Sequence, residues 1–122
     1  MEDLVKVLKS LSDETRLRML MLIEQEELCV CEVMQILDMR QSRVSRHLNI
    51  LRDAGLAKAR RQGTWMFYRS VANESSEHHA QVVDVLKKWT ENNETVRRDL
   101  ARLKECIADR GVDGHCPIPE TA

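Results

Sequence analysis

Residues 41–55 have the pattern of one short helix with two chemically different sides. At about 100° per residue, one side of this helix collects three apolar residues, Val44, Leu48 and Leu51. The polar residues that point away from that side are Ser42, Arg46, Asn49 and Asp53. Gly55 predicts where the helix ends, because glycine enters the left-handed cap conformation without steric cost. The fold must therefore bury one side of this helix and leave the other for a polar partner.

The N-terminal half of this helix carries hydrogen-bond donors and no acid. This composition suits base edges and phosphates in the major groove of DNA, and a solvated basic face is the other interpretation. His47 lies between the two sides and suits either packing or contact. The candidate DNA-binding residues of the helix are Gln41, Ser42, Arg43, Ser45, Arg46 and His47.

Length and composition favour one mostly helical domain. With 3% aromatic residues in 122, the core must come from Leu, Val, Ile, Met and Ala. We expect a folded domain over residues 1–110 and a flexible tail over 111–122. The sequence shows no membrane-length apolar run and no leader pattern, so we expect a cytoplasmic protein. In a reducing cytosol its four cysteines are expected to be thiols, metal ligands or redox sensors rather than structural disulfides.

The formal net charge of −1 conceals a strongly basic middle. Residues 40–69 contain eight Lys or Arg residues and a single acid, Asp53, so the rest of the chain is acidic. A basic surface on an acidic body confines non-specific attraction to one face, which suits a small DNA-binding protein.

Three further helices are predicted before residue 41. Residues 2–9 and 13–26 show helical periodicity, and Ser12 or Asp13 can cap the second helix. A short third helix covers residues 33–37, and the helix at 41 follows after a tight turn. This order is the helix-turn-helix arrangement, in which the second helix enters the groove.

A β-hairpin is predicted directly after Gly55. Residues 56–61 and 65–71 are strand-like, and Gly63 permits the turn between them. Arg60 and Arg61 are expected near its tip, where a wing would contact phosphate or the adjacent minor groove. An exposed turn with no partner is the alternative.

The C-terminal part, residues 75–109, is predicted to be a long helical stretch. Apolar residues recur with heptad spacing from Leu86 onward, and Asn93 within this seam either fixes the register or marks a break. Since no other helix remains to cover the seam, we expect a homodimer through the N- and C-terminal helices. The expected fold class is mainly α with a small β-hairpin, a winged helix-turn-helix.

Several spaced motifs resemble the ArsR family of winged-helix, metalloid-responsive repressors. They are residues 11–17 (LSDETRL), 27–32 (ELCVCE), 41–48 (QSRVSRHL) and 51–56 (LRDAGL). The resemblance implies a homodimer that binds a palindromic operator of its own arsenic resistance operon and leaves it when As(III) or Sb(III) binds. It assigns the inducer thiolates to Cys29 and Cys31 and implies no required cofactor. An enzyme is not expected, because the sequence shows no paired nucleophile and base and no phosphate loop. The family pattern has a third cysteine where this chain has Met34.

The chemistry of the two cysteines favours a soft ligand, because thiolates select thiophilic ions. Positions 29 and 31 lie about 200° apart on an ideal helix, so both sulfurs reach one ion only if the backbone is extended or distorted there. We therefore expect ligand binding to deform the start of the third helix. The alternative is that both are ordinary buried thiols.

Other candidate ligands have simpler interpretations. The pair His78-His79 is interpreted as a solvated helix start, and Cys106 beside the seam as a packed thiol. Cys116 lies in the tail, where burial gives no reason for a cysteine, so it is the candidate third metal ligand. The alternative functions are a repressor that senses cadmium, lead or zinc, and a repressor that senses thiol oxidation.

Overall fold

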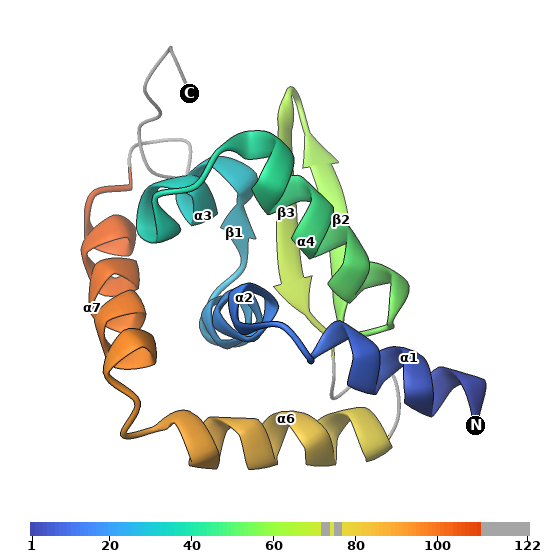
Figure 1. Cartoon of the computed structure of the whole chain (residues 1–122). Coiled ribbons are helices and arrows are strands. Elements are labelled where there is room, and N and C mark those ends of the chain that lie inside the picture. The colour runs from blue at the N-terminus through green and yellow to red at the C-terminus, as the bar shows by residue number, and fades with distance from the viewer. Residues whose placement is uncertain (72–73, 75–76, 111–122) are drawn as a thin grey trace.

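The computed structural model describes residues 1–71, 74 and 77–110 and places nine elements among them (Figure 1). They are α1 (Glu2–Ser10), α2 (Glu14–Gln25), β1 (Leu28–Cys29), α3 (Val30–Leu37), α4 (Gln41–Asp53), β2 (Ala57–Gln62), β3 (Trp65–Ser70), α6 (Glu77–Thr90) and α7 (Glu94–Ala108). The four N-terminal helices and the hairpin are confirmed, with α3 beginning three residues earlier than predicted. The predicted tail, residues 111–122, lies outside the described residues.

Helix α2 is the centre of the core. Met19, Leu20 and Leu22 are completely buried, and α2 contacts α4, α7 and β3. Figure 1 shows α2 nearly end-on, with the other elements arranged around it. Its first turn is fixed by Asp13, whose side chain accepts a hydrogen bond from the backbone N–H of Arg16 at 3.0 Å.

Gly55 ends α4 as the sequence predicts. It adopts a φ of 82°, and its N–H donates to the carbonyl of Arg52 while the N–H of Leu56 donates to that of Leu51. These two bonds are the pair that closes a helix through a left-handed glycine. The chain thereby turns directly from α4 into β2.

The sheet has three strands in the order β1-β3-β2, all antiparallel. The sequence predicted only the hairpin of β2 and β3. The third strand, β1, has two residues, and it pairs Leu28 with Tyr68 and Cys29 with Phe67. The hairpin is thus attached to the segment that precedes α3.

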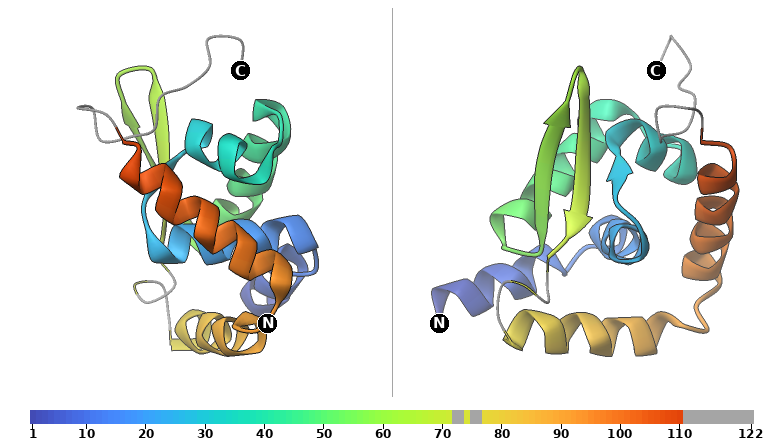
Figure 2. Two further views of the ribbon diagram at one scale, coloured as in Figure 1. Left: turned by 90° about the vertical axis from the view of Figure 1, so that its left-hand side faces the viewer. Right: turned by 180° about the vertical axis from the view of Figure 1, so that it is seen from behind.

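The predicted C-terminal helical stretch forms two helices, so Asn93 marks a break and does not fix the register of a seam. The helix breaks at residues 91–93, and Asn93 caps α7 by accepting a hydrogen bond from the N–H of Val96 at 3.1 Å. Helices α6 and α7 run in different directions, and α7 packs on α2 and α3 (Figures 1 and 2). The α7 half of the predicted seam is therefore covered within the same chain. No helix among the described residues is long and apolar enough to cross a membrane.

Candidate functional site

Helices α3 and α4 form the helix-turn-helix and hold the candidate DNA-binding side chains. Asp38 turns the chain with a φ of 54°, and the N–H of Met39 closes the end of α3 on the carbonyl of Met34. The inner side of α4 is fixed by three completely buried residues, Val44, Leu48 and Leu51. This packing determines which residues of α4 face outward.

Five of the six candidate DNA-binding residues of α4 are at least partly exposed, and their contact with DNA remains a prediction. Four of the candidate residues are exposed and Ser45 is half-buried; the exposed ones are Gln41, Ser42, Arg43 and Arg46. The first turn of α4 contains no acidic side chain, so the partial positive charge of the helix N-terminus adds to that of the arginines. This surface is suited to an anionic partner.

His47 is the exception, because it faces inward with 6% of its surface exposed. Its Nδ1 lies 3.1 Å from Nη1 of Arg16, whose Nε donates to the carbonyl of Ser10. Burial lowers the pKa of His47, and the nearby Asp13 opposes this effect. Since an arginine can only donate, Nδ1 accepts and the ring is neutral. In this structure His47 links α4 to α2 and to the end of α1, and is not part of the outward surface.

The hairpin of β2 and β3 projects beyond α3 and α4 (Figures 1 and 2), and Gly63 makes its turn with a φ of 63°. Arg61 is exposed near the tip. Arg60 forms an ion pair with Glu27, with Nη2 2.6 Å from Oε1, and its guanidinium lies 4.5 Å from the centre of the Phe67 ring. The hydrogen bonds from Arg60 to Glu27 raise the pKa of the arginine. Arg60 therefore ties the wing to the segment before β1, and its predicted DNA contact remains a prediction.

Cys29 and Cys31 lie together beneath the wing. Cys29 is the residue before α3 and has an extended backbone, with φ −79° and ψ 159°, whereas Cys31 lies in the first turn. Their Cα atoms are 5.3 Å apart and their sulfurs form a disulfide. The sequence predicted thiols here, and it predicted that the helix must deform to bring the sulfurs together. Because α3 begins after Cys29, the extended backbone already brings them together.

The disulfide of Cys29 and Cys31 is buried against the wing. Cys29 is completely buried, Cys31 is 6% exposed, and the two form a small cluster with Phe67. On the next residue of β3, the hydroxyl of Tyr68 donates to Oδ1 of Asn49 in α4 at 2.6 Å. A continuous set of contacts therefore joins the cysteines to the wing and to α4.

Glu32 and Arg110 were not found by sequence reasoning. Glu32 is completely buried and its Oε1 accepts the backbone N–H of Cys29 at 2.9 Å. Arg110, just after α7, donates from Nε to Oε2 of Glu32 at 3.0 Å. The position of Glu32, three residues after the residue that caps α3, was a signal for its role. Nothing local in the sequence pointed to Arg110, which is 78 residues away.

Cys106 and His79, two other residues considered as ligands, lie in different parts of the fold. Cys106 is buried in the core, with its sulfur 3.8 Å from Oε2 of Glu32, but it is disulfide-bonded and not the packed thiol that was expected. Cys116 lies outside the described residues. Nε2 of His79 lies 3.2 Å from the carbonyl oxygen of Ala54. Among the described residues, no group of three His, Cys, Asp or Glu side chains is placed to hold a metal ion.

Comparison with known proteins places this geometry among regulators. Residues 13–59 match the family described as bacterial regulatory protein, arsR family. The chain is 42% identical to the arsenic resistance transcriptional regulator ArsR1 of Pseudomonas putida, over 81% of this chain and 76% of the relative. It is 38% identical to the arsenical resistance operon repressor of Escherichia coli, over 86% and 90%. A cadmium resistance regulatory protein homologue of Staphylococcus aureus is 37% identical over 67% of this chain and 65% of that protein.

Solved structures agree with the fold. Reduced HlyU from Vibrio cholerae superposes with a TM-score of 0.62 at 31% identity, covering 72% of this chain and 88% of that one. A homodimeric winged helix-turn-helix DNA-binding domain from Mycobacterium bovis gives a TM-score of 0.63 at 27% identity, covering 76% and 82%. The winged helix-turn-helix predicted from the sequence is therefore confirmed.

Proposed function

The chain belongs to the ArsR family of bacterial transcriptional regulators, and we propose that it represses an arsenic resistance operon until As(III) or Sb(III) binds at Cys29 and Cys31. The observation that carries the proposal is the convergence of these two sulfurs at the start of the helix-turn-helix, in contact with the wing. Two relatives that the chain matches over most of its length carry arsenic resistance in their names.

In this proposal α4 enters the major groove of the operator. The exposed Ser42 and Arg46 would contact base edges, with Gln41, Arg43 and Ser45 beside them. Arg61 on the wing would contact phosphate, which positions the protein without reading sequence.

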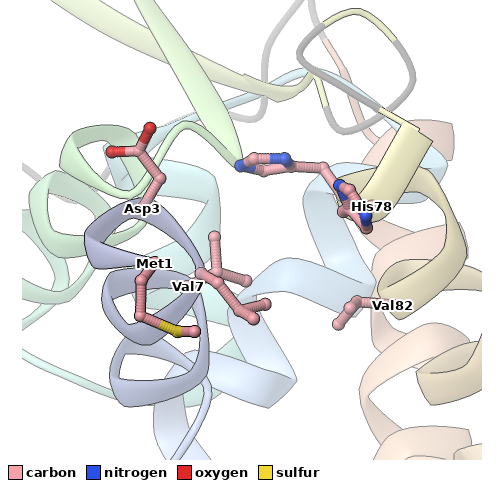
Figure 3. A pocket seen from close by; sticks show the side chains of 7 residues that line it. Met1, Asp3, Val7, His78 and Val82 are labelled. Atoms are coloured by element: carbon pink, nitrogen blue, oxygen red, sulfur yellow. The ribbon is translucent and has the colours of Figure 1, made fainter.

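A homodimer would supply the second copy of α4 that a palindromic operator needs. Large apolar side chains remain exposed on α1 and α6; they are Leu4, Val5, Leu8, Val85 and Trp89. A pocket of 440 Å³ lies between these two helices, with Met1, Val7 and Val82 on its walls (Figure 3). We propose that the partner subunit covers this surface, as symmetric pairing buries the same patch on both chains.

The donor set fits a trivalent metalloid. The pair that forms the disulfide supplies, once reduced, two thiolates at one point, and soft ions prefer sulfur. Pyramidal As(III) has room for a third sulfur, which we assign to Cys116. A dithiol reductant would first transfer two electrons and two protons to the Cys29–Cys31 disulfide and become a disulfide itself, because only the thiolate form of the cysteines is a ligand.

Burial provides the route from inducer to operator. An ion bound between Cys29 and Cys31 has to displace neighbours, since the pair is packed against Phe67. A shift of Phe67 along β3 moves Tyr68, whose hydroxyl is bonded to Asn49 of α4. The inducer thus favours an arrangement of wing and α4 that differs from the one that binds DNA. Inducer and operator DNA therefore each lower the affinity for the other.

A second candidate is a repressor that responds to thiol oxidation, which the disulfide between Cys29 and Cys31 favours. Here a peroxide would take two electrons and two protons from the thiol pair and leave as water, with the S–S bond as the product. A cadmium sensor is the third candidate, supported by the relative from Staphylococcus aureus.

Anisotropy of labelled DNA from upstream of the gene, titrated with arsenite, antimonite, cadmium and peroxide, separates these candidates. Arsenite and antimonite should release the wild-type protein. Cys29→Ser and Cys31→Ser should bind DNA as well as the wild type does and not respond, whereas Arg97→Gln, which changes an exposed residue of α7, should respond as the wild type does. Release by peroxide or by cadmium alone would favour the other candidates, and loss of DNA binding in the serine variants would make the cysteines structural.

A further inference from the structure

We propose that Arg110 is a positioning residue of the thiol site, which acts through Glu32 to hold Cys29 in place and makes inducer binding and the docking of α7 dependent on each other. The proposal rests on the proposed function for the inducer. Its basis is a chain of short contacts from the end of α7 to the backbone of Cys29.

The first step is the control of Cys29 by Glu32. The extended backbone of Cys29 brings its sulfur beside that of Cys31, and Oε1 of Glu32 holds that conformation by accepting the Cys29 N–H at 2.9 Å. Glu32 is completely buried, so solvent cannot replace this bond without local opening. The orientation of the thiol pair therefore depends on where the carboxylate of Glu32 lies.

The second step is the control of Glu32 by Arg110. A buried carboxylate needs a paired charge, and Nε of Arg110 provides it at 3.0 Å from Oε2. The same guanidinium donates from Nη2 to the carbonyl of Glu27 at 2.9 Å and lies 3.4 Å from a carboxylate oxygen of Glu26. Arg110 thus contacts the chain before Cys29, at Glu26 and Glu27, and after it, at Glu32.

The third step is the attachment of Arg110 to α7. Asp99 of α7 pairs with Arg18 of α2, and Arg102 donates to the carbonyl of Ile36 at the end of α3. These contacts dock α7 on α2 and α3 and bring Arg110 to Glu32. Because the docked end of α7 holds Glu32, and through it Cys29, in the arrangement that binds the inducer, bound inducer in turn stabilises the docked α7 end. By reciprocity, undocking that end changes inducer affinity by the same factor.

The experiment uses the full chain, kept reduced with a non-thiol reductant, and measures arsenite affinity and amide hydrogen exchange. Arg110→Gln should lower arsenite affinity about 10- to 100-fold, which is typical for the loss of a residue that orients a metal ligand without contacting the metal itself. Without arsenite, it should speed exchange in residues 28–37. In the wild type arsenite should change exchange in residues 98–110, and this change should be lost in Arg110→Gln.

Two variants serve as controls. Arg97→Gln removes an exposed arginine of α7 that donates to the carbonyl of Glu91 and to Oδ1 of Asn92 in the loop before that helix, and it should behave as wild type. Arg110→Lys keeps the charge with fewer donors and should restore part of the affinity and of the arsenite-dependent exchange in α7.

The outcomes separate this proposal from the proposed function. If Arg110→Gln binds arsenite as tightly as wild type and keeps the exchange response of α7, the positioning role is wrong. If arsenite does not bind the wild type, the proposed inducer is wrong. In that case faster exchange of residues 28–37 in Arg110→Gln still supports the positioning role, and unchanged exchange overturns it.

Discussion

Replacing Asp99 by Ala should lower the free energy of unfolding by about 3 kcal/mol. Asp99 is 2% exposed and accepts two hydrogen bonds from Arg18, from Nε at 2.8 Å and from Nη2 at 3.0 Å. Removing one partner of a buried ion pair typically costs about 3–5 kcal/mol, because a charge is left without compensation. The lower end applies here, since the Arg18 side chain is 17% exposed and regains some water.

The measurement is urea denaturation followed by circular dichroism. All variants must be compared at one protomer concentration, because the stability of a dimer depends on it. Asp99→Asn keeps an acceptor and should cost less than Asp99→Ala. Glu74→Ala is the matched control, since its ion pair with Arg69 is exposed on both sides and should contribute little.

A double variant tests the origin of the effect. Arg18→Met with Asp99→Leu removes both charges and keeps apolar volume, so it should recover most of the lost stability. The reasoning fails if Asp99→Ala is no more destabilising than Glu74→Ala, or if the double variant is as unstable as Asp99→Ala.

Four further predictions concern binding and pH. Arg46→Ala should weaken operator binding by about 1–3 kcal/mol and relax its sequence preference. Arg61→Ala should weaken binding to all DNA and reduce the slope of log affinity against log salt concentration by about one. Equal effects of both variants on operator and random DNA would contradict these roles. Burial lowers the pKa of His47, so the unfolded chain binds the proton of this histidine more tightly than the folded chain does. The free energy of unfolding should therefore fall as the pH drops below the ordinary histidine value of 6.5. His47→Gln should remove this pH dependence in thermal unfolding. Tyr68→Phe removes the hydroxyl bonded to Asn49 and should reduce arsenite-induced release more than it reduces DNA affinity measured without arsenite. Unchanged release would mean that the signal travels only through α3. Cys116→Ser should weaken arsenite binding without abolishing the response, while Cys106→Ser changes it little; an unchanged sulfur count by X-ray absorption in Cys116→Ser would exclude the tail as a ligand.

Local patterns in the sequence predicted most of the fold. The side of α4 that packs, the glycine that ends it and the turn of the hairpin follow from periodicity and backbone preference, which need only neighbouring residues. The strand β1 was missed because two residues carry no periodicity, and it exists only through pairing with β3. The break at Asn93 was left open, because a heptad spacing and an asparagine cap fit the same residues until the docking of α7 decides between them.

The candidate site was predicted in its chemistry and not in its surroundings. The motif pointed to Cys29 and Cys31, but their arrangement depends on α3 beginning one residue after Cys29. The contacts around them come from distant parts of the chain: Arg60 reaches Glu27 over 33 residues, and Arg110 reaches Glu32 over 78. Such pairs are set by tertiary packing, which no local pattern encodes.

The burial of Cys29 and Cys31 also sets a time scale. Cys29 is completely buried, so a ligand reaches both sulfurs only during the brief intervals in which the segment opens, and its association rate is multiplied by the open fraction. The same enclosure slows departure, because a bound ion must wait for the next opening. Under the proposed function, a cell that meets a short pulse of metalloid would start transcription with a delay and would stop it later still. Burial of the two cysteines would thus make transcription respond to sustained changes in metalloid concentration and not to rapid fluctuations.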